Sequence, residues 1–366
     1  MHTSRTAVSP DRARAVTTVW KYCWLPFLSQ NGITDPFLTG VRDKIPLLRV
    51  FAIRLRDGRL SRGGKPIRAA HVRDEIFRVA QAFTRVGAPD PRFDCFGKID
   101  SRLSTLYTAW TKMDPAPRRV KPLPLPILHH AAQHAAPTNP TQIAIVDMAW
   151  IAVFYLLRPG EYCKSADNAP LTAGSIKMLI GNRPLDVLTC PIPDLFRATS
   201  SSITFDTQKN RNRGEIIAQG LSGHPRACPT KALARRIQYL RLHRAATGTP
   251  LCSVWNTQHQ FHVTSDMITK TLQTSAAALP HLGIAPADIS ARSMRAGGAM
   301  ALLCGRIDAD VIKLVGRWKS DAMFRYLHAQ ALPIAKDLAR TMLHHGNFTL
   351  APGTDTPAAA ASLLAP

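Results

Sequence analysis

The segment Ile289–His328 reads ISARSMRAGGAMALLCGRIDADVIKLVGRWKSDAMFRYLH and decides how the rest of the chain is interpreted. Arg292 and Arg295 are three residues apart in a helical pattern, so both guanidinium groups leave the same helix face. Gly297 and Gly298 follow them and leave backbone room for a close neighbour. The segment therefore predicts a closely packed helix that carries two fixed cations.

The second half of this segment adds an indole and a phenol. Gly316, Arg317 and Trp318 end one helix, and Tyr326 lies about two turns into the next. Arginine offers a rigid donor fork that matches two phosphate oxygens, and tyrosine can act as a covalent nucleophile. The set suits phosphate chemistry. The alternative is that these are ordinary helix-face arginines and a core tyrosine.

Charge indicates the kind of partner. The chain has 366 residues, with 47 Lys and Arg against 24 Asp and Glu, a formal net charge of +23. Such an excess favours a polyanion, and nucleic acid is the first choice, ahead of an anionic membrane or a ribosome-associated role. We find no run of 18 apolar residues and no signal-peptide core, so we expect no membrane partner.

The cysteine pattern and the lack of phosphate-binding motifs argue against several kinds of cofactor. The seven cysteines form no C-x-x-C pair, which argues against a zinc module and against a disulfide framework. Neither a P-loop nor a G-x-G-x-x-G motif is present. We therefore expect no cofactor and no metal, and reduced thiols in an intracellular protein, nuclear if the source is eukaryotic.

Composition and periodicity divide the chain. The stretch MDPAPRRVKPLPLPI, which starts at Met113, is too rich in proline for a helix and predicts an extended strap whose Arg118, Arg119 and Lys121 could touch DNA phosphates. The predicted divisions are a disordered basic N-terminus at 1–13, a helical domain at 14–113, a Pro-rich linker at 114–127, a second domain at 128–346 and a disordered tail at 347–366.

Two further elements carry candidate residues. An apolar, buried helix is predicted over Thr141–Leu157, and it leads into Arg158-Pro-Gly-Glu161. Residues 175–188 and 201–219 predict strands, and a basic turn at 209–214 interrupts the second range. In this turn Lys209 could act as a general acid, with Lys177 as the reserve, or it is simply one more basic turn residue. Arg211 and Arg213 in the same turn are candidate DNA contacts.

The order of these motifs resembles the tyrosine recombinases, the phage-integrase family, and among them the recombinases of eukaryotic mobile elements. R-x-x-E at 158–161 resembles the first arginine box, and ARSMRAGG at 291–298 resembles the second, usually written H-x-x-R. GRWKSDAMFRY at 316–326 resembles the third box with its nucleophile. Arg292 stands where the family has histidine. The spacing from Trp318 to Tyr326 is one residue shorter than in most bacterial members, as in the eukaryotic elements.

This resemblance implies a fold and a reaction. The fold is mainly α with a small β-sheet (α+β), made of an N-terminal core-binding bundle and a catalytic domain. The reaction cleaves and rejoins double-stranded DNA through a 3′-phosphotyrosyl intermediate, without metal or ATP, in a homotetramer on paired sites. The implied roles are phosphate binding by Arg158 and Arg295 with Arg292 as a third cation, an indole N–H from Trp318, attack by Tyr326, protonation of the leaving oxygen by Lys209, and positioning by Glu161.

Three other functions fit parts of the sequence. A catalytically inactive DNA-binding remnant of a mobile element would explain Arg292 in place of histidine. A type IB topoisomerase would share the chemistry and only relax DNA. A helical interaction scaffold, basic for other reasons, would require nothing of Tyr326.

Overall fold

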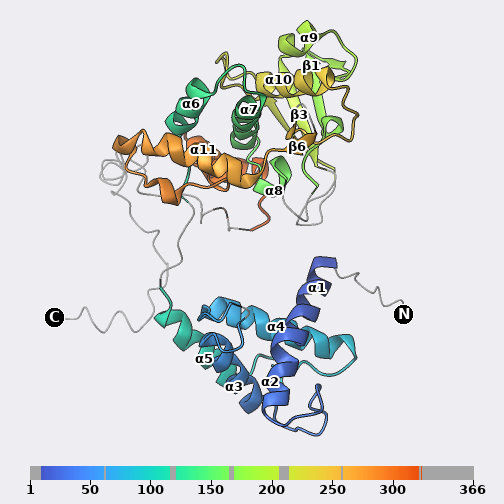
Figure 1. Ribbon diagram of the computed structural model, residues 1–366, viewed down its shortest axis with the longest axis vertical. Helices are drawn as coiled ribbons and strands as arrows, with labels where there is room; N and C mark the ends of the chain where they lie inside the picture. Colours follow the sequence, from blue (N-terminus) through green and yellow to red (C-terminus); the bar gives the residue numbers. More distant parts are fainter. Residues whose placement is uncertain are drawn as a thin grey trace, which may run out of the picture. The chain divides into compact units, whose positions relative to one another are not determined.

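The computed structural model describes residues 10–61, 63–115, 121–164, 169–205, 214–256, 259–320 and 323. The chain divides into two compact units, Met1–Pro117 and Arg118–Pro366. Helices dominate both units, and the described strands lie in the second (Figure 1). The expected fold class, mainly α with a small β-sheet, is confirmed. None of the helices in the described part of the chain is both long and apolar enough to cross a membrane.

The N-terminal unit is a helical bundle around an aromatic core. Trp24 and Phe27 pack against Phe51 with ring centroids 5.0 and 5.1 Å away, and all three side chains are fully buried. Such aromatic contacts supply much of the apolar burial that a small bundle needs. The helices are α1 (Pro10–Val19), the π-helical turn η1 (Trp20–Trp24), α2 (Leu25–Gln30), α3 (Ile45–Arg56), α4 (Ala69–Arg85) and α5 (Ser101–Met113).

The C-terminal unit is built around helix α7, whose residues 144–153 are all buried, as its continuous apolar sequence predicts. Helix α6 was not expected, because it starts inside the Pro-rich stretch. Pro124 is its N-cap and Pro126 falls in its first turn, where no N–H is required. The helices are α6 (Leu125–His134), α7 (Pro140–Phe154), α8 (Pro159–Tyr162), α9 (Ile192–Arg197), α10 (Pro229–Leu242), α11 (Ser265–Ala277), α12 (Ser293–Cys304) and α13 (Ala309–Val315). Single 3-10 turns are η2 (Ala173–Ser175), η3 (Pro280–Leu282) and η4 (Pro286–Asp288).

A four-stranded antiparallel sheet, in the order β2-β1-β3-β4, packs against α10 and α9. Strands β3 and β4 are in register from Ser200 opposite Gly220 to Phe205 opposite Glu215. A separate hairpin pairs β5 with β6. The strands are β1 (Ile176–Ile180), β2 (Arg183–Leu185), β3 (Ser200–Phe205), β4 (Glu215–Gly220), β5 (Ser253–Trp255) and β6 (Gln260–His262).

Two glycines let α12 lie against neighbouring backbone. A Cβ at Gly298 would overlap the carbonyl oxygen of Val153 in α7, and a Cβ at Gly297 would overlap the carbonyl oxygen of Leu123. The N–H of Leu123 also donates to the carbonyl of Ser293 at the start of α12, over 3.1 Å. The close neighbour that the sequence predicted beside the two glycines is therefore main chain, on two sides of the helix.

Replacing Gly298 with alanine should destabilise the protein, because the added methyl group meets backbone that cannot rotate away. We expect a loss of about 1–3 kcal/mol in the free energy of unfolding, measured by urea denaturation. The control is Gly248→Ala in the same unit, where a Cβ meets nothing within 4 Å. Equal stability of the two variants would contradict the close packing.

Candidate active site

The main-chain carbonyl of Leu156 accepts hydrogen bonds from two arginines. Nη1 of Arg295 lies 2.8 Å from this oxygen, and Nη2 of Arg317 lies 3.3 Å from it. Leu156 follows the last turn of α7 with φ of 50°, in the left-handed region. Carbonyls at a helix C-terminus lack helical partners and carry partial negative charge, which favours cations there. The second and third sequence boxes thus meet at the end of α7.

The carboxylate of Glu161 joins the first box to the same place. It accepts from the N–H of Arg158 (2.8 Å) and from Nη1 of Arg158 (3.0 Å). It also accepts from Nη1 and Nη2 of Arg317, at 3.2 and 2.9 Å, in a two-point ion pair. A carboxylate with several charge-assisted donors is rigidly held. One acidic side chain therefore lies between two guanidinium groups.

Glu161 remains ionised despite its burial. Burial alone would raise the pKa of its carboxyl, but the charge and hydrogen bonds of Arg317, together with the contacts from Arg158, outweigh it and hold the pKa below its usual range. Burial also lowers the pKa of Arg317. A guanidinium starts so far above neutrality that Arg317 stays charged. The ion pair is therefore intact at pH 7.

Arg295 is covered by an indole ring. Its guanidinium carbon lies 4.1 Å from the ring centroid of Trp318, a cation–π distance, and only 4% of the residue is exposed. It also donates to the carbonyl of Gly316. Glycine at position 316 makes room for this ring, because a Cβ there would overlap atoms of the six-membered ring of Trp318. In this conformation Trp318 stands between Arg295 and solvent.

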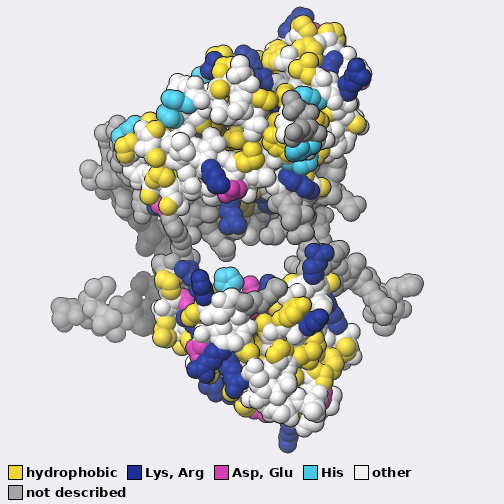
Figure 2. Space-filling model, viewed as in Figure 1, with side chains coloured by type: hydrophobic (Ala, Val, Ile, Leu, Met, Phe, Trp, Pro, Cys, Tyr) yellow, Lys and Arg dark blue, Asp and Glu magenta, His cyan; other side chains and the backbone are white. Residues whose placement is uncertain are grey.

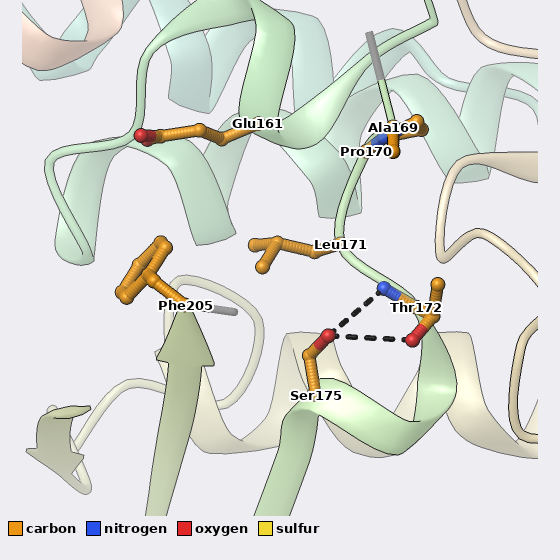
Figure 3. Close-up of a pocket in the computed structure, with 7 residues that line it drawn as sticks. All are labelled: Glu161, Ala169, Pro170, Leu171, Thr172, Ser175 and Phe205. Atoms are coloured by element: carbon orange, nitrogen blue, oxygen red, sulfur yellow. Dashed lines mark hydrogen bonds between the residues drawn. The ribbon is translucent and has the colours of Figure 1, made fainter. Parts of the chain in front are cut away.

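A pocket opens beside Glu161. Figure 3 shows the Glu161 carboxylate and the ring of Phe205, at the tip of β3, on one side of this pocket. Leu171 lies near the middle of the view, and Ser175 lies beyond it. The guanidinium carbon of Arg317 lies 3.7 Å from the Phe205 ring centroid, so Arg317 fills the space between that ring and the carboxylate. The site is therefore walled by β3 as well as by α7 and α8.

The predicted site residues fall into three groups. Arg158, Glu161, Arg295 and Trp318 are brought together around Leu156. Three others lie elsewhere: Arg292 is exposed at the N-cap of α12, Lys177 is exposed on β1, and Lys121 is half-buried before α6. The remaining candidates, Tyr326, Lys209, Arg118, Arg119, Arg211 and Arg213, lie outside the described residues.

Two participants were absent from the sequence-based set. Arg317 was taken as part of a helix end, although it stands inside the third box between Gly316 and Trp318. Its position beside these two residues was the available signal. The carbonyl of Leu156 had none, because a main-chain acceptor after an apolar helix leaves no mark on the side-chain pattern.

Basic side chains are spread over the molecular surface. Figure 2 shows Lys and Arg in dark blue on the drawn face of each unit, with acidic side chains, in magenta, sparser among them. This distribution fits the net charge of +23. Among the described residues, no group of three or more His, Cys, Asp or Glu is arranged to hold a metal ion.

Comparison with solved structures gives matches over most of the chain. One is lambda integrase, solved as a dimer bound to a core site, with 15% identity, 90% of this chain and 92% of that chain covered, and a TM-score of 0.48. The transposon Tn1549 integrase in complex with transposon right end DNA has 11% identity, coverages of 93% and 96%, and a TM-score of 0.47. XerA recombinase has 11% identity, coverages of 93% and 100%, and a TM-score of 0.38.

All three are tyrosine recombinases. They belong to the family that the sequence motifs resemble. No family model matches the sequence, and no curated protein matches it. At these identities and TM-scores, function rests on the residues of this chain.

The Glu161 carboxylate should contribute strongly to stability. We expect Glu161→Gln to lower the free energy of unfolding at pH 7 by about 3 kcal/mol, because it leaves the buried guanidinium of Arg317 and the partly exposed one of Arg158 poorly paired. Since the folded-state pKa of Glu161 is lowered, this stabilisation is present above the unfolded pKa of about 4.3 and is lost as pH falls through the folded value.

Urea denaturation between pH 3 and 8 checks this, with Asp266→Asn as the control. Asp266 also pairs with a cation, Lys270, but both side chains are more than 70% exposed. That exposed pair is expected to contribute less than about 1 kcal/mol. An equally small effect for Glu161→Gln would show that the carboxylate is not what holds the arginines.

Proposed function

We propose that the protein is a site-specific DNA recombinase or integrase that cleaves and rejoins DNA through Tyr326. The observation that carries the proposal is the meeting of three sequence boxes, near residues 158, 295 and 317, at one carbonyl and one carboxylate. Residues so far apart in the chain converge only through the fold. They leave a positively charged centre with a partly exposed arginine.

Arg158 is the arginine best placed for a phosphate oxygen. One of its terminal nitrogens donates to Glu161, and 23% of its side chain remains exposed. Its other N–H groups have no partner among the described residues, so they can bind an incoming anion. A preorganised donor in a partly buried site stabilises developing negative charge better than water does. We assign Arg158 to a non-bridging oxygen of the scissile phosphate.

Arg295 would reach the phosphate only after a local change. Its two terminal nitrogens donate to the carbonyls of Leu156 and Gly316, and the Trp318 indole covers it. We propose that DNA binding displaces the indole, so that Arg295 meets the second oxygen and Trp318 donates its indole N–H. Arg292, exposed at the start of the same helix, is available as the third cation.

The reaction itself follows the family's chemistry. Tyr326 Oη bonds to phosphorus and releases its proton to solvent, while the bond from phosphorus to the 5′ oxygen breaks. Lys209 gives the leaving oxygen its proton, producing a free 5′-hydroxyl and a 3′-phosphotyrosine. Attack by another 5′-hydroxyl reverses these steps and reseals the strand. The phosphotyrosyl bond conserves the energy of the phosphodiester, so neither ATP nor metal enters the scheme. Four protomers on two duplexes would perform the exchange; lambda integrase has been solved as a tetramer bound to a Holliday junction.

The surface supplies affinity for DNA. The charge of +23 and the spread of Lys and Arg support contacts to the phosphate backbone that do not depend on base sequence. Arg118, Arg119, Lys121, Arg211 and Arg213 are the assigned contacts. Among them, Lys121 lies within the described residues, just before α6.

One observation favours the inactive, DNA-binding remnant as second candidate. The burial of Arg295 beneath Trp318 removes a phosphate ligand that the reaction needs. A protein fixed in this conformation would bind DNA without cutting it. The two candidates agree on salt-sensitive DNA binding and differ in the covalent step.

The covalent step can be trapped directly. The protein is incubated without metal with nicked duplexes from the ends of its own genetic element, and the products are separated on a denaturing gel. We expect a protein–DNA band that Tyr326→Phe abolishes, since phenylalanine has no nucleophilic oxygen. DNA binding that weakens with salt but gives no band would favour the inactive remnant.

Truncating Arg158 should separate binding from chemistry. We expect Arg158→Ala to slow adduct formation by about 10²–10³-fold, the usual effect of losing one preorganised donor to a developing anion. DNA affinity, measured by fluorescence anisotropy, should fall much less, because many other cations contact the backbone. Arg183→Ala, which removes a 64% exposed arginine on β2, is the matched control and should leave the rate unchanged. Equal rates for both variants would remove Arg158 from the site.

A further inference from the structure

The Arg317 side chain is almost completely enclosed. It is 2% exposed, against 23% for Arg158. Phe205 closes one face of its guanidinium at 3.7 Å, and its two terminal nitrogens are directed at Glu161 and Leu156. Its Nε is buried without a partner among the described residues. A phosphate has no open path to this group in the described structure.

The backbone of Arg317 is also unusual. Its φ is 58°, a left-handed value that costs a residue with a Cβ roughly 1 kcal/mol. This conformation follows the end of α13 and turns the side chain back toward α8, where Glu161 lies. Strain and burial of a charge are both unfavourable, so the contacts that Arg317 makes must offset them.

Glu161 connects Arg317 to Arg158. Oε1 of Glu161 accepts from Nη1 of both arginines, at 3.0 Å from Arg158 and 3.2 Å from Arg317. Oε2 accepts from the main chain of Arg158 and from Nη2 of Arg317. The buried guanidinium of Arg317 thus holds the carboxylate in place, and the same carboxylate accepts a hydrogen bond from the partly exposed Arg158.

We propose that Arg317 is a positioning residue for the phosphate-binding Arg158, acting through the carboxylate of Glu161 that both arginines share. This rests on the function proposed above. Arg317 does not touch DNA. It neutralises Glu161, which leaves Arg158 its positive charge, and it sets the angle at which the Arg158 fork meets a phosphate oxygen. Lysine could supply the charge but not the two-point geometry.

The test compares Arg317→Met, Arg317→Lys, Glu161→Gln and the double variant Glu161→Gln/Arg317→Met in the nicked-duplex assay. We expect Arg317→Met to slow adduct formation by about a hundredfold, the scale of a misplaced group, with DNA affinity unchanged within about twofold. Arg317→Lys should recover part of the rate. The double variant should be no slower than the slower single variant, because both changes release the same arginine.

The pH profile separates positioning from general damage to the fold. Without Arg317 the pKa of Glu161 rises, because the charge of Arg317 is the largest of the effects that lower this pKa against the effect of burial. The acid limb of the cleavage rate should therefore move to higher pH in Arg317→Met. Arg244→Met is the matched control, since Arg244 also has a left-handed φ of 51° but is exposed beyond the end of α10. Additive losses in the double variant with an unmoved acid limb would overturn the proposal.

A second readout does not depend on cleavage. The free energy of unfolding of each protein is compared with that of its Glu161→Gln counterpart between pH 3 and 8. We expect the carboxylate-dependent part to be smaller in Arg317→Met, with its midpoint at higher pH than in the wild type. If the wild type forms no adduct, the recombinase function fails, and this shift alone decides whether Arg317 holds Glu161. An unchanged midpoint would refute the positioning role.

Discussion

The hydrogen bonds from Arg295 and Arg317 to the carbonyl of Leu156 are the interaction on which the rest of the site depends. This oxygen lies just beyond the C-terminus of a helix that is buried along most of its length, so it is desolvated and partly negative. Two segments that are distant in sequence bring guanidinium groups to it. Gly297 and Gly298 in α12 allow this approach, because a side chain at Gly298 would push the helix away from α7 and one at Gly297 would push it away from Leu123.

The cluster carries more positive than negative charge. The cluster holds three arginines and one carboxylate, Glu161, which pairs with Arg158 and Arg317. Arg295 and Arg317 are nearly buried. Burying cations costs free energy unless they are paired and hydrogen-bonded, and here carbonyls and aromatic rings provide much of the compensation. A cluster selected only for stability would carry fewer cations or more acids. An anionic substrate would neutralise the surplus of positive charge.

Much of the architecture could be predicted from sequence. The buried helix before Arg158, the paired strands and the close backbone beside Gly298 follow from apolar runs, alternation and small residues. The order and spacing of the sequence motifs identified Arg158, Glu161, Arg295 and Trp318 as site candidates, and the fold brings these four residues together. Helix α6 was missed because a proline, which usually excludes a helix, is tolerated in its first turn. The role of Arg317 could not be foreseen, because it depends on a left-handed backbone angle and on Phe205 from a distant strand.

The acceptor at Leu156 has a consequence for how this protein can vary over time. A main-chain oxygen has no side chain to lose, so no single substitution at that position deletes the acceptor itself. Selection can act there only through the path of the backbone and the packing of Leu156 with Ala299, Ile312 and Met323. In related sequences the position would drift among apolar residues of similar bulk, and the arginines that converge on it would stay fixed. The residue whose carbonyl binds two arginines would then look like an ordinary core residue.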